Sequence, residues 1–152
     1  MSPVTSTDLT ERAVIFTLGE ERYGVSVDRV REVQRIVAFS GAPSHSEAVI
    51  GMVNLRGAVV PVIDMRIVAG IPATEYTAET PMIICSTEDQ LVALVVDQVE
   101  DVRDLPDARL KPLTKLHPLA QQVLGTCRCN HSLVYLLDVD ALVAQVALCE
   151  AV

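Results

Sequence analysis

Short apolar runs separated by polar turns are the main pattern along this chain. Five of these runs are β-branched or otherwise apolar and are bounded by Gly, Pro, Asp or Asn: residues 14–18, 59–63, 82–85, 91–96 and 133–137. Runs of this length and composition predict β-strands. Several short strands in succession favour an all-β barrel or sandwich, with strands buried on their inner faces.

Patterns that predict helices are few. Residues 28–35 carry Val30 and Val33 at a three-residue step and predict about two helical turns. Residues 46–50 predict one capped turn before a glycine. Residues 140–148 repeat apolar positions at helical spacing after an acidic start, so we expect a C-terminal amphipathic helix that seals the end of a barrel.

The chain repeats itself. Asp28 and Asp97 lie 69 positions apart, and the same offset relates the surrounding residues, Val27, Val30, Glu32 and Val33 in the first copy and Val96, Val99, Asp101 and Val102 in the second. One small β unit used twice predicts two lobes, residues 13–80 and 81–149, after a flexible segment 1–12. A core of about 70 residues is marginal alone, so the lobes should share strands, and the groove between them is a natural docking site.

One turn stands out, because Asn54-Leu55-Arg56-Gly57 leads straight into the strand at 59–63. A rigid apolar strand then supports a planar, permanently charged guanidinium at a turn, which is a common way to build a recognition contact. The second copy carries residues 127–131, with two cysteines and a histidine, at the equivalent place. Only one lobe therefore presents this arginine, as a protein joining two different partners would need.

Composition removes several classes of function. Twelve basic and twenty acidic residues give a net charge of −8, and aromatic residues make up 3% of the chain with no Trp. Nucleic-acid binding is disfavoured because a basic face and stacking platforms are both missing. No apolar run approaches the roughly 20 residues of a membrane helix, and the first residues lack a signal-peptide pattern, so we expect a cytoplasmic protein with no membrane insertion.

Two constellations could carry chemistry. On an extended strand, Cys127, Cys129 and His131 would face one side and could form part of a zinc or redox site. Structural zinc takes four ligands, and a fourth would require Cys85 or Cys149 to fold back, so free cysteines and no metal or cofactor are expected. Acid–base catalysis could likewise use Asp residues 28, 64, 97 and 138. However, Asp28 is equivalent to Asp97 in the repeat, and Asp64 to Asp138, so roles at strand ends and helix caps explain all four more simply.

The repeat, the Arg56 turn, the opening hairpin pattern at 16–25, the run at 95–102 and the closing run at 133–139 together resemble the CheW family of chemotaxis coupling proteins. The resemblance covers nearly the whole chain, and the stretch through Asp64 and Arg66 is its most specific part. It departs from the family after Gly125, where residues 126–130 replace a glycine-rich turn.

The resemblance implies a mainly β, CheW-like fold of two SH3-like five-stranded barrels with short helices and a C-terminal helix, and no catalysis. It implies a cytoplasmic adaptor recruited to membrane receptor arrays, with the chemoreceptor cytoplasmic tip and the regulatory domain of the histidine kinase CheA as partners. The receptor-facing positions would be Val30, Glu32, Val33, Asn54, Arg56 and Gly57. The kinase-facing positions would be Val37, Ala38, Phe39, Val60, Val62, Asp64 and Arg66. A generic SH3-like module is the alternative, although few aromatic residues are present to build a polyproline groove.

Overall fold

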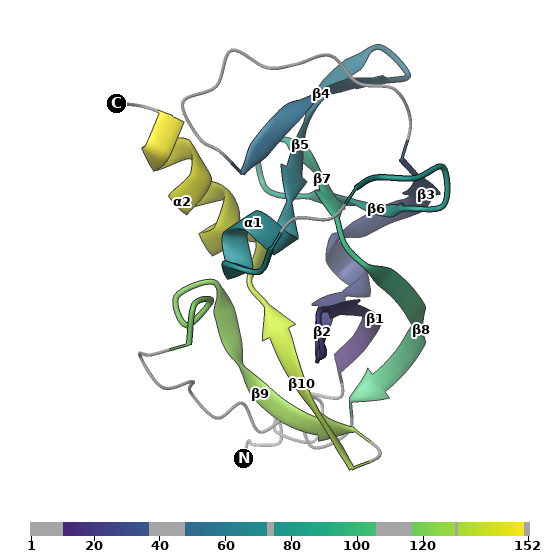
Figure 1. Ribbon diagram of the computed structural model, residues 1–152, viewed down its shortest axis with the longest axis vertical. Coiled ribbons are helices and arrows are strands. Elements are labelled where there is room, and N and C mark those ends of the chain that lie inside the picture. The colour runs from purple at the N-terminus through teal and green to yellow at the C-terminus, as the bar shows by residue number, and fades with distance from the viewer. Residues whose placement is uncertain (1–10, 37–47, 73–74, 106–116, 130, 151–152) are drawn as a thin grey trace, which may run out of the picture.

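The computed structural model describes residues 11–36, 48–72, 75–105, 117–129 and 131–150 (Figure 1). The strands and helices in chain order are β1 (Glu11–Leu18), β2 (Glu21–Ser26), a 3-10 turn (Val27–Arg29), β3 (Val30–Arg35), β4 (Val49–Leu55), β5 (Ala58–Asp64), α1 (Met65–Ala69), β6 (Pro81–Ser86), β7 (Leu91–Val95), β8 (Gln98–Leu105), β9 (Val123–Cys129), β10 (Ser132–Leu137) and α2 (Val139–Glu150). In the described residues, no helix has both the length and the apolar character needed to cross a membrane.

The strands form two five-stranded sheets of the same design. The first sheet has the order β8-β1-β2-β10-β9 and the second has the order β3-β6-β7-β5-β4. Replacing each strand by the strand five places away along the chain converts one order into the other, which confirms the expected duplication. Each sheet has three antiparallel pairings and one parallel pairing, which is β2 with β10 in the first sheet and β5 with β7 in the second.

The two sheets do not divide at residue 80. The hairpin β1–β2 pairs with β8 and β10 from the second half of the chain, and the hairpin β6–β7 pairs with β3 and β5 from the first half. Each sheet therefore combines a hairpin from one repeat with three strands from the other. The units 13–80 and 81–149, for which shared strands were expected, therefore each contribute strands to both sheets.

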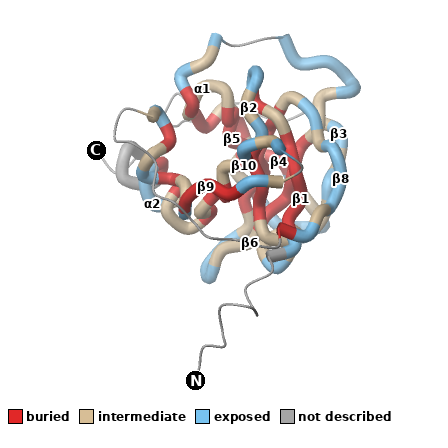
Figure 2. Tube along the Cα trace, turned by 90° about the horizontal axis from the view of Figure 1, so that it is seen from below, coloured by how far each residue is buried: buried red, intermediate tan, exposed pale blue. Residues whose placement is uncertain are grey.

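Three groups of buried side chains explain why many strands are apolar on both faces. Seven buried residues, including Val60, fill the space that the second sheet encloses, and six, including Ile15, fill the space that the first sheet encloses. A larger group, the central core, joins the two sheets and takes in Phe16, Ile83 and Leu142 from both sheets and α2. Figure 2 shows the buried residues along the strands in the interior, while β8 at a sheet edge is mostly exposed. The shared central core makes the two lobes one packed body.

Residues 28–35 are not helical, contrary to the prediction. They form the end of the 3-10 turn and the edge strand β3, whose residues alternate between half-buried and exposed. The three-residue step arises because the register of β3 against β6 shifts by one residue between Val30 and Glu32. Such a bulge lets Val30 and Val33 share one face of a strand, which imitates helical spacing.

An aspartate immediately precedes each helix: Asp64 is the last residue of β5, and Asp138 directly follows β10. Asp64 accepts a hydrogen bond from the backbone N of Arg66 at 2.9 Å at the start of α1, and Asp138 accepts one from Ala141 at 3.1 Å at the start of α2. The repeat thus uses the same cap twice, as expected for these two aspartates. The C-terminal helix was predicted, whereas the five-residue α1 was not.

Candidate functional site

The predicted recognition turn is the two-residue connection between β4 and β5. Arg56 and Gly57 both have positive φ, 51° and 90°, and Asn54 Oδ1 accepts a hydrogen bond from the Gly57 N–H at 3.0 Å. Positive φ at both central residues is the type I′ geometry that suits a twisted hairpin. Glycine meets this requirement without strain, whereas arginine does so at an energetic cost. The turn therefore holds Arg56 in a conformation that the hairpin imposes on it.

Arg56 forms a bidentate ion pair with Glu32. Its Nη1 and Nη2 lie 2.7 and 3.3 Å from the two carboxylate oxygens, and Gln34 Nε2 donates to the same carboxylate at 2.8 Å. The hydrogen bond from Arg56 lowers the pKa of Glu32, and Glu32 in turn raises the pKa of Arg56. Because β3 and β4 are the two edges of the second sheet, this pair closes the seam of that lobe. The Arg56 side chain stays 77% exposed.

The structure brings four of the six predicted receptor-facing residues together and separates the other two. Asn54, Arg56 and Gly57 lie at the turn, and Glu32 reaches them from β3. Val30 and Val33 pair with Cys85 and Ile83 and thus lie on the face of β3 that bears the central core. Val30 packs against that core, whereas Val33 is 44% exposed at its edge.

Val33 borders a groove between the two sheets. A cavity of ≈ 410 Å³ is lined by Val33, Gln34, Arg35, Glu79, Pro81, Asp97, Gln98 and Val99. Its walls come from β3 and β8, the edge strands that the repeat makes equivalent. Val102 of β8 pairs with Val14 of the central core and is 52% exposed, so it extends the same apolar face. Val33 and Val102 are themselves 69 positions apart, and the sequence pattern did not single out Val102 as an exposed apolar residue.

Three of the predicted kinase-facing residues are buried and so cannot contact a partner. Val37, Ala38 and Phe39 lie outside the described residues. Val60 and Val62 are 1% and 0% exposed in the interior of the second sheet, and Asp64 is 1% exposed, so their side chains offer no surface to a partner. The exposed residues of β5 are Ala58 and Val59 at its start, and the Val59 side chain is 64% exposed.

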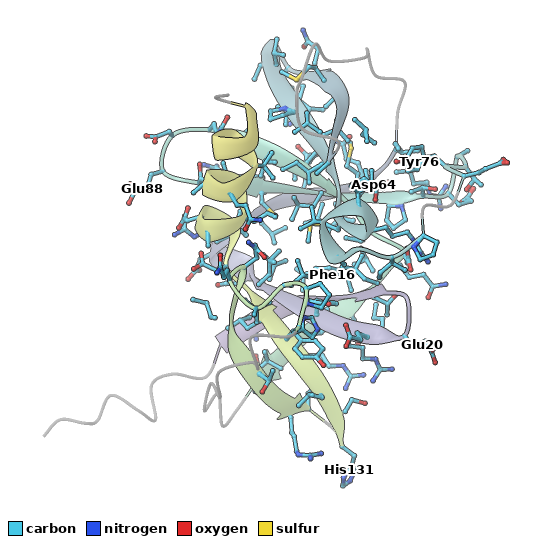
Figure 3. The ribbon with its side chains drawn as sticks, turned by 60° about the vertical axis from the view of Figure 1, so that its left-hand side comes forward. Phe16, Glu20, Asp64, Tyr76, Glu88 and His131 are labelled. Carbon is cyan, nitrogen blue, oxygen red and sulfur yellow. The ribbon has the colours of Figure 1, made fainter. Side chains whose placement is uncertain are left out.

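Asp64 and Arg66 belong instead to a polar joint beside a second cavity. Tyr76 donates a hydrogen bond to Asp64, and these two side chains point toward one another in Figure 3. Burial and the bond to Asp64 raise the pKa of Tyr76. Arg66 forms a bidentate ion pair with Asp97 at 2.7 and 2.9 Å and donates to the carbonyl of Pro72 at 2.9 Å. The cavity of ≈ 440 Å³ is lined by these side chains together with Thr17, Gly19 and Thr80.

The predicted Cys/His face is only partly formed. Cys127 is buried and Cys129 half-buried on β9, where both adjoin the interior of the first sheet. His131 lies at the β9–β10 turn with φ of 68° and points away from the molecule at the tip of the hairpin (Figure 3). Among the described residues, no group of three His, Cys, Asp or Glu side chains could hold a metal ion.

Comparisons with known proteins agree with this architecture. The family model described as "CheW-like domain" matches residues 12–147. The "Chemotaxis protein CheW" of Klebsiella aerogenes is 28% identical over 147 residues, covering 95% of this chain and 89% of that protein. The protein of the same name from Bacillus subtilis is 31% identical over 101 residues, covering 66% and 65%. The crystal structure of "scaffolding protein TtCheW" from Thermoanaerobacter tengcongensis superposes with a TM-score of 0.76 at 27% identity, covering 85% of this chain and 89% of that one.

Proposed function

The chain belongs to the CheW-like domain family, and from that premise we propose that it is a non-enzymatic adaptor that couples chemoreceptors to the histidine kinase CheA. The observation that carries the proposal is the groove between β3 and β8. Val33 and Val99 line the groove, and Val102 lies next to it on β8, where it pairs with a central-core residue as Val99 does. Val33 and Val102 extend the central core outward on equivalent strands of both lobes. An apolar helix face laid into the groove would extend that core.

The receptor's cytoplasmic helical tip is the occupant proposed for this groove. The ion pair Arg56–Glu32 lies on one lobe only. It therefore supplies a polar contact at one side of the groove, which orients a helix whose apolar side contacts Val33 and Val102. Arg56 is suited to this because its guanidinium is exposed and can be shared between Glu32 and a partner's carboxylate or carbonyl groups.

The kinase surface is proposed for the outer face of the β4–β5 hairpin. Val59 is the most exposed large apolar side chain among the described residues, and its cross-strand neighbour is the exposed Asn54. Val59 does not line the groove cavity, so the kinase contact is proposed outside the groove. Interfaces of this signalling kind are often small and weak, so many contacts in a receptor array would act together. We accordingly propose a cytoplasmic protein that joins the array through its partners.

The proposal is tested by binding isotherms with a chemoreceptor cytoplasmic fragment and with the CheA regulatory domain. Val102→Asp places a charge on the groove, and Leu124→Asp is a matched control, since Val102 and Leu124 are both 52% exposed and Leu124 lies on β9. We expect Val102→Asp to lose receptor binding and Leu124→Asp to keep it. Val59→Asp should weaken kinase binding alone. Failure of the unmodified protein to bind either partner at micromolar concentration would refute the adaptor.

A further inference from the structure

Three segments of the chain meet at Asp97, where the chain crosses from the second sheet to the first between β7 and β8. Arg66 donates to both carboxylate oxygens, and the Gly19 N–H donates to Oδ2 at 2.7 Å. The Asp97 N–H donates to the carbonyl of Thr17 at 3.1 Å. Asp97 therefore ties the crossover to α1 of one lobe and to the β1–β2 turn of the other.

The repeat contains a second, weaker version of this joint. Arg66 and Asp140 hold the same place in α1 and α2, two residues after the capping aspartates, and Asp140 pairs with Arg29 at the crossover between β2 and β3. In this version the helix carries the acidic residue and the crossover carries the basic one. Arg29 and Asp140 make a single contact, of 2.6 Å between Nη2 and Oδ2. The Arg29 and Asp140 side chains are 38% and 45% exposed, against 17% and 21% for Arg66 and Asp97. Bidentate geometry and shielding from water make the Arg66–Asp97 pair the stronger of the two.

The stronger joint lies at the groove. Asp97 and Gln98 line the groove cavity, and β8 begins at Gln98. Val99 is only half-buried and Val102 is mostly exposed, so burial holds this end of β8 weakly. The ladder with β1 also holds this end, since Gln98 and Val99 pair with Thr17 and Phe16. The polar contacts of Asp97 add to that ladder at the crossover, on the side that faces the groove.

We propose that Arg66 and Asp97 are positioning residues of the receptor groove. By holding the crossover, the pair sets β8 so that Val99 and Val102 stand opposite Val33 across the groove. This inference rests on the proposed function only in naming the ligand of the groove. Removing one charge would leave a partly shielded ion without its partner, which favours movement of the crossover toward water.

The test compares Asp97→Asn with Asp140→Asn, which removes the same charge at the equivalent joint. Asparagine can still accept the Gly19 N–H bond, so the change acts mainly on the pair with Arg66. We expect Asp97→Asn to weaken binding of the chemoreceptor fragment about tenfold, within the usual range for coupled sites. Binding of the CheA regulatory domain should stay within twofold, and Asp140→Asn should leave both affinities within twofold. Amide hydrogen exchange of residues 98–102 should speed up in Asp97→Asn alone.

Two results would overturn the inference. One is receptor affinity retained within twofold by Asp97→Asn; the other is an equal loss for both partners, which would indicate general destabilisation. If the unmodified protein binds no receptor fragment, the proposed function fails, and hydrogen exchange alone decides: faster exchange at 98–102 supports positioning and unchanged exchange refutes it. Should Asp97→Asn not fold, Arg66→Lys, which keeps the charge and loses the fork, takes its place with a smaller loss of about threefold expected.

Discussion

Arg56 combines backbone strain with an exposed charge, and this combination separates a structural role from a binding role. Asparagine adopts positive φ more readily than arginine, and Asn-Gly is the preferred type I′ pair. Arg56→Asn should therefore unfold in urea at a midpoint equal to or above that of the unmodified protein, because an exposed ion pair contributes little to stability. The same variant should bind the chemoreceptor fragment more weakly. Arg56→Lys should also bind more weakly, since it lacks the planar fork. Unchanged affinity in both variants would contradict the assigned role.

Cys85 predicts a pH dependence of stability. Burial raises its pKa from 9.0 to about 12, so folding disfavours the thiolate. The resulting contribution to stability is fully present below pH 9 and is lost as the pH rises toward 12. The free energy of unfolding should therefore fall between pH 9 and 11, and it should fall less steeply in Cys85→Ala. Tyr23 and Tyr135, whose pKa values are also raised by burial, leave part of the slope in the variant. Urea titrations at several pH values measure this change in the free energy of unfolding. Identical slopes in the two proteins would exclude Cys85 as a cause of the pH dependence.

The recognition turn could be predicted from residues, whereas the kinase-facing set could not. Asn54, Arg56 and Gly57 form a local motif whose geometry depends on neighbours in sequence, and the structure shows the expected turn. Val60 and Val62 were placed on a surface because an apolar run does not reveal which of its residues face inward. Their neighbour Val59 has the same chemistry and the opposite exposure.

At the scale of elements, the two helix caps are equivalent in sequence and unequal in structure. Asp64 is buried and accepts from both the Arg66 N–H and the Tyr76 hydroxyl, while Asp138 is half-buried and its side chain accepts from the Ala141 N–H. Asp64→Ala should cost about 2–4 kcal/mol of unfolding free energy, because it removes a buried carboxylate that accepts from both the Arg66 N–H and the Tyr76 hydroxyl. Asp138→Ala should cost about 1 kcal/mol. Equal costs in urea denaturation would show that the tyrosine contact adds nothing.

Strands were more predictable than helices for a physical reason. All five apolar runs named from the sequence lie in strands, apart from Val96 just after β7, and most of their residues are buried. Residues 28–35 were wrongly predicted to be helical because a bulge in the edge strand β3 produces a three-residue spacing of apolar residues. The five-residue α1 is too short to establish a period, and it is held by the Asp64 cap and the left-handed Gly70 at its end.

The whole molecule is built by exchange between its repeats, and this predicts one cooperative transition. Each sheet needs strands from both halves of the chain, and the central core joins both sheets. Urea unfolding followed by circular dichroism and by Tyr fluorescence should give coincident curves. Separately expressed fragments 13–80 and 81–149 should each fail to fold alone. Two resolved transitions, or a stably folded fragment, would contradict the exchanged architecture.

The duplication was visible in the sequence and predicted shared strands, but not which strands are exchanged. A constant offset of 69 positions shows that two units are alike, yet it carries no information about which copy of a hairpin completes which sheet. The boundary at residue 80 followed from the length of the repeat, which locates the two copies but not the pairing of their strands. The groove depends on this exchange, because β3 and β8 become edge strands only when each pairs with the other repeat's hairpin.

Simultaneous binding tests the central claim most directly, namely that one small protein joins two partners through separate faces. In analytical ultracentrifugation of this protein with a chemoreceptor cytoplasmic fragment and the CheA regulatory domain, we predict a ternary species containing all three. Val102→Asp should leave only the complex with the kinase domain, and Val59→Asp only the complex with the receptor fragment. Competition between the two partners for one site, or the absence of any complex, would contradict the account.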